Sequence, residues 1–246
     1  KYINRCLKSC INQKTKKNYE IIFIDDNSTD HSLDKAKKYN NKVKIISTDK
    51  SQNISRFNTF YQLNTYFTGY KKAKGKIICF LDSDDFFKKN KLTKIYKVFY
   101  KNKNANIVFD RPRYFYNKNN ILNSNEKFGY RRNKWPKFPP QSCISVRKIF
   151  LIKNKKKIFN KKFNLLTLDF RIAVIGAKIK NNIFFLQKDL TYYFQHAKSE
   201  TSTKFKFLKR NWFKRRLQAH NFYCYHNRKI LSLDYIITRL INFLFY

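Results

Sequence analysis

The chain has 246 residues, of which 42% are hydrophobic and 18% aromatic, enough to build a substantial core in one large domain. Lysine and arginine number 55 against 15 acidic residues, so the net charge is +40 and the mean hydropathy is −0.67. With four glycines and four prolines the composition excludes collagen-like and Pro/Gly-linker proteins. No apolar run approaches the roughly 20 residues of a membrane-spanning helix.

The basic surplus allows three interpretations. A surplus of this size is typical of proteins that bind nucleic acid or an anionic membrane face. The chain is also rich in Lys, Asn, Ile, Phe and Tyr, which A/T-rich codons encode, so codon bias explains much of the charge without any function. The five cysteines form no C-x-x-C pair, which favours reduced thiols over a disulfide framework.

Strand-like apolar runs alternate with helical patterns along the first half of the chain. We expect strands at 19–24, 43–48, 76–81 and 106–110. We expect helices at 3–13, 30–39, 51–73 and 88–102, with Ser28 or Thr29 capping the second. This alternation predicts an α/β fold with a largely parallel sheet.

The second half is less regular. The polar stretch 111–140 reads as a loop, and order resumes at 143–152. An apolar helix is expected at 165–178, followed by strand segments within 183–196. From 204 onward basic and aromatic residues alternate, and the last stretch is an amphipathic or strongly apolar helix.

Two of the predicted strands end in acids. Asp25 and Asp26 follow the first, and Asp82, Asp84 and Asp85 follow the third. Ligands of open α/β sheets bind beyond the carboxyl ends of the strands. Because close carboxylates repel one another, they favour a divalent cation such as Mn²⁺ or Mg²⁺, which usually completes its shell with substrate phosphates. Helix capping or pairing with lysines is the alternative explanation.

A glycine-rich phosphate loop is absent from the sequence. Neither G-x-G-x-x-G nor G-x-x-x-x-G-K-[ST] occurs, which argues against dinucleotide dehydrogenases and P-loop NTPases. A metal ion would then have to bind the phosphates.

The two segments YEIIFIDDNSTDHS and AKGKIICFLDSDDFF together resemble family 2 glycosyltransferases of the GT-A fold. The resemblance covers about residues 3–200. It implies a Rossmann-like, mostly parallel sheet flanked by helices over 1–203, with a basic helical tail over 204–246. The family opens with a strand of the type I-S-I-I-I-P-x-Y-N, whereas this chain starts at the helix that follows it, so we expect that strand to be missing.

The resemblance also implies roles for individual residues. Asp25 and Asp26 would contact the nucleoside. Asp82 and Asp84 would bind the nucleotide sugar, and Asp84 with Asp85 would hold the metal.

Three further segments carry weaker resemblances. Asp169 in LDFRIA matches the family's general base, although an acid favoured by a helix N-terminus is the alternative. His196 in YYFQHAKSETS resembles a late histidine segment near the donor phosphates and metal, although an ordinary histidine is as good an explanation. The family's A-R-N-x-G segment is matched only loosely in this sequence. Arg56 and Asn58 stand near it, and Arg56 is expected to contact the donor.

The function implied is the inverting, metal-dependent transfer of a sugar from a nucleotide diphosphate, expected to be UDP, to a cell-surface glycan or lipid-linked acceptor. The expected location is the bacterial cytoplasm, peripheral on the inner membrane face through 204–246, with no nucleic-acid partner. Two alternatives stay open. One is a basic, non-enzymatic module that binds membrane or nucleic acid. The other is a phosphohydrolase with a D-x-D-x-[TV] motif, although Phe86 stands where that motif needs Thr or Val.

Overall fold

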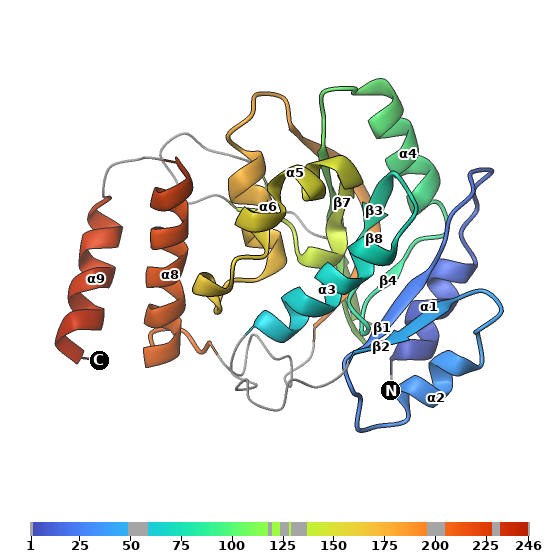
Figure 1. Ribbon diagram of the computed structural model, residues 1–246, viewed down its shortest axis with the longest axis horizontal. Coiled ribbons are helices and arrows are strands. Elements are labelled where there is room, and N and C mark those ends of the chain that lie inside the picture. The colour runs from blue at the N-terminus through green and yellow to red at the C-terminus, as the bar shows by residue number, and fades with distance from the viewer. Residues whose placement is uncertain are drawn as a thin grey trace.

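The computed structural model describes residues 2–48, 59–117, 120–123, 128, 137–195, 205–227 and 232–245. Strands fill the centre of the molecule and helices surround them (Figure 1). The N-terminal elements lie at one end of the long axis, and the two C-terminal helices stand side by side at the other.

The N-terminal part forms a parallel strand pair covered by helices. β1 (Ile22–Asp25) pairs with β2 (Lys44–Ser47). α1 (Ile3–Ile11) contacts α2 (Ser32–Lys37). The side chains buried between them come from both helices and from the segment before β2: Ile3, Leu7, Ala36 and Val43. Apolar residues at helical spacing on α1 therefore supply one side of this small core.

The larger sheet is mixed. Its strands are β3 (Ile77–Cys79), β4 (Phe86–Phe87), β5 (Ile107–Asn117), β6 (Asn120–Asn123), β7 (Ile144–Arg147) and β8 (Ile183–Phe194). Their order is β3-β7-β5-β8-β4, with β6 beside β5. β5 and β8 are parallel, whereas β3 with β7, β5 with β7, β4 with β8 and β5 with β6 are antiparallel.

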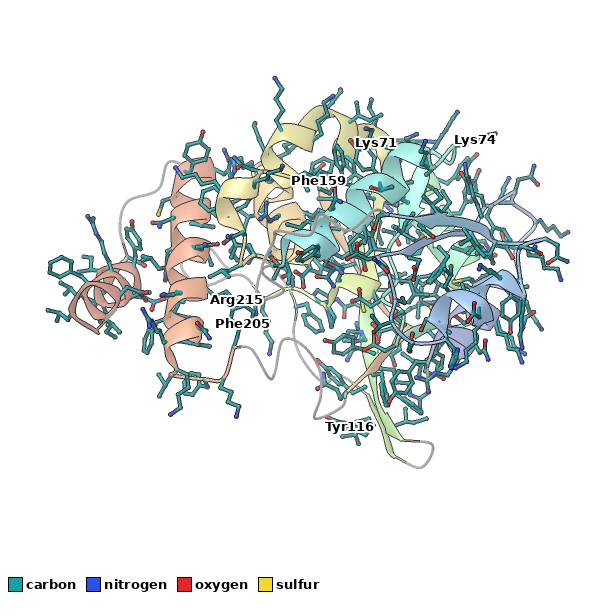
Figure 2. The ribbon with its side chains drawn as sticks, turned by 60° about the horizontal axis from the view of Figure 1, so that its bottom comes forward. Lys71, Lys74, Tyr116, Phe159, Phe205 and Arg215 are labelled. Carbon is teal, nitrogen blue, oxygen red and sulfur yellow. The ribbon has the colours of Figure 1, made fainter. Side chains whose placement is uncertain are left out.

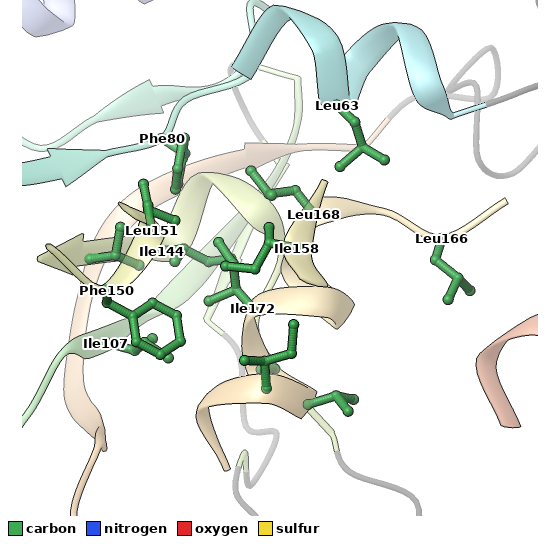
Figure 3. Packing of buried hydrophobic residues seen from close by; sticks show 14 of the residues in the cluster. Leu63, Phe80, Ile107, Ile144, Phe150, Leu151, Ile158, Leu166, Leu168 and Ile172 are labelled. Carbon is green, nitrogen blue, oxygen red and sulfur yellow. The ribbon is translucent and has the colours of Figure 1, made fainter. Parts of the chain in front are cut away.

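Helices bury their apolar faces against this sheet. They are α3 (Phe60–Lys72), α4 (Lys91–Lys101), α5 (Lys148–Ile158) and α6 (Leu168–Gly176), with the 3₁₀ turns η1 (Gln141–Cys143) and η2 (Lys161–Phe163). The main core joins α3, α5, α6 and the central strands (Figure 3). At Gly176 a Cβ would lie 2.1 Å from Cδ1 of the buried Ile107 side chain, so a larger residue here would require that side chain to move.

The two C-terminal helices are α8 (Arg210–Asn227) and α9 (Leu233–Phe245). Phe222 and Ala219 of α8 belong to the main core, and Phe222 is fully buried. α9 packs on α8 and leaves apolar side chains in solvent, among them Leu240 and Phe243. In the part of the chain that the structure describes, no helix combines the length and apolarity needed to cross a bilayer.

The α/β alternation is confirmed, but three predictions of detail are wrong. The sheet is mixed rather than mostly parallel, because β7 and β4 enter it antiparallel. Residues 111–117 continue β5 instead of forming a loop, since the backbone of this stretch pairs with β8 on one side and with β6 on the other. Neither Ser28 nor Thr29 caps α2: its N-cap is His31, which makes no side-chain capping bond.

Candidate active site

Carboxylates from separate segments line one large cavity of about 1620 Å³. Asp26 follows β1, Asp82 and Asp84 follow β3, and Asp169 lies in the first turn of α6. The cavity therefore brings together Asp169 and three of the five acids that the sequence predicts at two strand ends, whereas Asp25 and Asp85 are buried and do not line it.

The segment after β1 is fixed by the two neighbouring acids. Buried Asp25 accepts hydrogen bonds from the Ser28 hydroxyl at 2.5 Å and from the Ser28 backbone N–H at 3.3 Å. Asp26 accepts one from the Thr48 hydroxyl at 2.7 Å, beside the end of β2. Asn27 has a positive φ of 56°, a conformation that asparagine tolerates better than most residues. Asp25 thus shapes the turn, whereas Asp26 lines the cavity.

Asp82 is the most heavily hydrogen-bonded acid of the site. Its Oδ1 accepts from the Gln141 side chain at 3.0 Å, from the Gln62 side chain at 3.3 Å and from the Tyr66 hydroxyl. Its backbone N–H donates to the Ser142 hydroxyl at 2.9 Å. Burial raises the pKa of Asp82 to about 6; the nearby charges of Asp84 and Asp169 act in the same direction, and the donors offset part of the rise.

Asp85 is fully buried and does not line the cavity. Its Oδ1 accepts the Phe194 backbone N–H at 2.8 Å, while Oδ2 has no hydrogen-bond partner among the described residues. Burial raises the pKa of Asp85 well above its usual range, and the charges of Asp82 and Asp84 raise it further.

Arg5 of α1 supplies a cation next to these acids. Its guanidinium donates to the Asp84 carbonyl at 3.0 Å and lies 4.4 Å from the ring centroid of Phe86 and 4.6 Å from that of Phe115. Burial lowers the pKa of Arg5, and the charges of Asp85 and Asp84 counteract that effect. The stacked guanidinium holds the backbone of the acid segment by planar contacts that a lysine would not reproduce.

A buried ion pair is connected to the acid segment through Ser142. The Lys91 ammonium lies 2.7 Å from the Asp110 carboxylate, and both side chains are fully buried. Lys91 also donates to the Thr191 hydroxyl at 2.7 Å and to the Ser142 carbonyl at 2.9 Å. Since Ser142 in turn accepts the Asp82 backbone N–H, the pair is connected to the site through one residue.

Asp169 projects from the start of α6 into the cavity. Its Oδ1 accepts the backbone N–H of the next residue, Phe170, at 2.7 Å, and its place in the first turn is favourable for an acid because of the helix dipole. Buried Arg171 fixes the chain before this helix, donating to the carbonyls of Leu166, Ile158, Asn160 and Phe163. The placement is compatible with both explanations of Asp169, a helix-start acid and a general base.

Other predicted site residues are not placed. Arg56, Asn58 and His196 lie outside the described residues. Conversely, sequence patterns gave no indication of Tyr66, Gln62, Gln141, Arg5 or Lys91, because their positions beside the acids arise only when separate segments pack together.

The chemistry of the acid segment fits a divalent cation. The pKa values of Asp82 and Asp85 are raised by burial and by the negative charges around them, and one Asp85 oxygen has no donor among the described residues. No group of three metal-ligating side chains occurs in the described ranges. A site with one or two protein carboxylates is nonetheless typical of Mg²⁺ bound together with substrate phosphates.

Fold and site together define an α/β protein with a carboxylate-lined cavity at its strand ends. The sequence model of Glycosyl transferase family 2 matches residues 1–159, and the chain belongs to that family. An uncharacterized glycosyltransferase of Haemophilus influenzae is 38% identical over 96 residues, which are 38% of this chain and 35% of that protein. One of Nostoc sp. is 26% identical over 225 residues, which are 80% of this chain and 62% of that protein.

Solved structures with the same fold include residues 1–349 of Staphylococcus aureus TarS in complex with UDP. That structure matches with a TM-score of 0.63 and 16% identity, and it covers 98% of this chain and 65% of the TarS chain. The likeness confirms the predicted GT-A fold. The chain spans less than two thirds of the length of these relatives.

Proposed function

We propose that the protein is a glycosyltransferase that moves a sugar from a nucleotide diphosphate, UDP in the first instance, to a hydroxyl of a glycan or lipid-linked acceptor. The observation that carries the proposal is the convergence of Asp26, Asp82, Asp84 and Asp169 on one cavity. The shared fold with TarS, which was solved with UDP and with UDP-GlcNAc, supports the choice of donor.

In the proposed reaction each acid has a separate task. Asp26, at the end of β1, binds the nucleoside. Asp84 and Asp85 would hold Mn²⁺ or Mg²⁺, which would supply positive charge for the leaving diphosphate. Asp82 is kept in place by Gln141, Gln62 and Tyr66 and orients the sugar.

Asp169 takes the proton from the attacking hydroxyl as that oxygen bonds to the anomeric carbon. The bond from this carbon to the diphosphate breaks on the opposite face, so the configuration inverts.

Calorimetry tests the donor site. UDP, GDP and dTDP are titrated with and without Mn²⁺ into the wild type, Asp84→Ala and a matched control, Asp34→Ala. Asp34 is an exposed acid of α2 that does not itself line the cavity. We expect metal-dependent binding of one nucleotide that Asp84→Ala abolishes and Asp34→Ala retains. Equal binding by both variants contradicts the donor assignment.

The role of Asp169 needs its own measurement. Asp169→Asn should abolish transfer while donor binding stays at the wild-type level, because the amide keeps the shape but cannot accept the proton. Transfer that survives in this variant would leave Asp169 as a helix-start acid.

The proposal also places the protein on the inner face of the membrane through its C-terminal segment. The apolar side chains that α9 exposes, Leu240 and Phe243 among them, support this placement, as does the basic charge of the chain. Co-sedimentation with anionic liposomes should decrease in Leu240→Gln/Phe243→Gln, with Tyr100→Gln, which removes an exposed aromatic on α4, as control. Unchanged binding by the double variant removes the membrane placement.

A further inference from the structure

A second, smaller cavity adjoins the large one. It has a volume of about 310 Å³, at the low end of ligand-binding cavities, and is lined by Tyr114, Phe128, Phe138, Pro140, Thr167, Asp169, Tyr193, Gln195 and Arg215. Pro140, Thr167, Asp169 and Tyr193 line both cavities. Asp169 therefore stands at the junction, with the candidate donor site on one side and a compartment for one sugar-sized unit on the other.

Arg215 brings a positive charge into the smaller cavity from α8. Figure 2 shows it beside Phe205, and its guanidinium carbon lies 4.6 Å from that ring centroid. Its one hydrogen bond to a described residue is long, 3.4 Å to the Thr167 hydroxyl. No carboxylate among the described residues forms an ion pair with Arg215, in contrast to its neighbour Arg216, which binds Asp234 at 2.5 Å. Among the described residues, Arg215 thus leaves N–H donors available to a ligand.

The other walls suit a sugar or polyol. Tyr114 and Tyr193 contact each other edge to face with ring centroids 6.1 Å apart, and Phe138 adds a third ring. Such rings provide apolar faces, and the Gln195 amide adds a hydrogen-bonding group. A guanidinium in this setting recognises planar or tetrahedral oxyanions through paired N–H donors.

We propose that the smaller cavity is the acceptor subsite and that Arg215 binds an anionic group, phosphate or carboxylate, on the acceptor. The acceptor class is then an anionic glycan or polyol rather than a neutral sugar. This inference rests on the proposed function. The hydroxyl oxygen bonds to the anomeric carbon, its proton passes to Asp169, and the diphosphate leaves with the electron pair of the broken bond.

Binding of three probes tests the proposal: glucose, glucose 6-phosphate and glucuronate. They have the same type of pyranose ring and differ in the group at its C6 position. Each is titrated at fixed ionic strength into the full chain saturated with UDP and Mn²⁺, using saturation-transfer NMR. The variants are Arg215→Gln and Arg215→Lys, with Lys214→Gln on the same helix as the control that also removes one charge. Thermal unfolding confirms that each variant is folded.

We expect the wild type and Lys214→Gln to bind at least one anionic probe about 10- to 100-fold more tightly than glucose, the range for a charge-assisted hydrogen bond. Arg215→Gln should remove that preference, and Arg215→Lys should retain part of it. Whether phosphate or carboxylate binds more tightly identifies the anion. No preference in the wild type, or an equal loss in Lys214→Gln, overturns the inference.

Two readouts separate this inference from the proposed function. UDP binding by calorimetry and slow hydrolysis of the sugar donor in the absence of acceptor report on the donor site alone. If both occur and no anionic preference is found, the acceptor inference fails while the proposed function stands. If neither occurs, the proposed function fails, and the acceptor inference fails with it.

Discussion

Replacing Lys91 with methionine should destabilise the protein strongly, although the volume changes little. The substitution removes the ammonium that lies 2.7 Å from Asp110 and leaves that carboxylate fully buried without its counterion. Breaking a buried ion pair in this way costs about 3–5 kcal/mol. For a chain of this length about 2–4 °C of melting temperature is lost per kcal/mol, so we expect a decrease of about 6–20 °C.

Urea denaturation at pH 7.5 and pH 5.5 measures the effect and tests its cause. Burial already raises the pKa of Asp110, so in Lys91→Met the carboxyl should take up a proton as the pH falls and part of the stability should return. The double variant Lys91→Met/Asp110→Leu should be close to the wild type, because it removes both charges together. A loss below about 1 kcal/mol in Lys91→Met, or a double variant as unstable as the single one, would refute the reasoning.

Three further predictions concern other parts of the fold and site. In metal-free buffer the contribution of Asp82 should lower the free energy of unfolding by up to about 3 kcal/mol as the pH rises from 4 to 6. A pKa of about 6 means that the folded state binds the Asp82 proton more tightly than the unfolded state does. Asp82→Asn, melted in parallel, should lack this pH-dependent decrease. Arg171→Leu should cost about 3 kcal/mol or more in urea melts, because four carbonyls lose a charged donor; a loss under 1 kcal/mol would contradict the role of Arg171. Phe222→Ala should cost about 3–5 kcal/mol, while Tyr225→Ala, exposed on the same helix, should cost little; equal losses would show that α8 does not depend on the Phe222 contact.

The strand-end acids could be predicted from sequence because their signal is local. A buried apolar run that stops at an acidic cluster fixes both the strand and the edge of the sheet where the carboxylates lie. The structure places Asp26, Asp82 and Asp84 around one cavity, in line with that expectation.

Contacts between distant segments were beyond sequence patterns. The donors to Asp82 come from positions 62, 66 and 141, and nothing in their local sequence marks them as neighbours. In the sequence, Arg215 is one of many cations in a basic segment. Its position in the smaller cavity follows only from the packing of α8 beside α6. The extension of β5 over 111–117 was missed for a similar reason: the polar and charged residues of this stretch resemble a loop, and only its pairing with β8 and β6 makes it a strand.

The full burial of the Lys91–Asp110 pair has a consequence for ionic strength. The exposed lysines that contribute to a net charge of +40 repel one another through solvent, and at about 0.15 M salt such forces fade over roughly 8 Å. The buried pair has no solvent between its charges, so added salt does not weaken it. Salt therefore relieves repulsion on the outside of the molecule and leaves the support beneath the acid segment intact, which makes moderately high ionic strength the favourable condition for handling this protein.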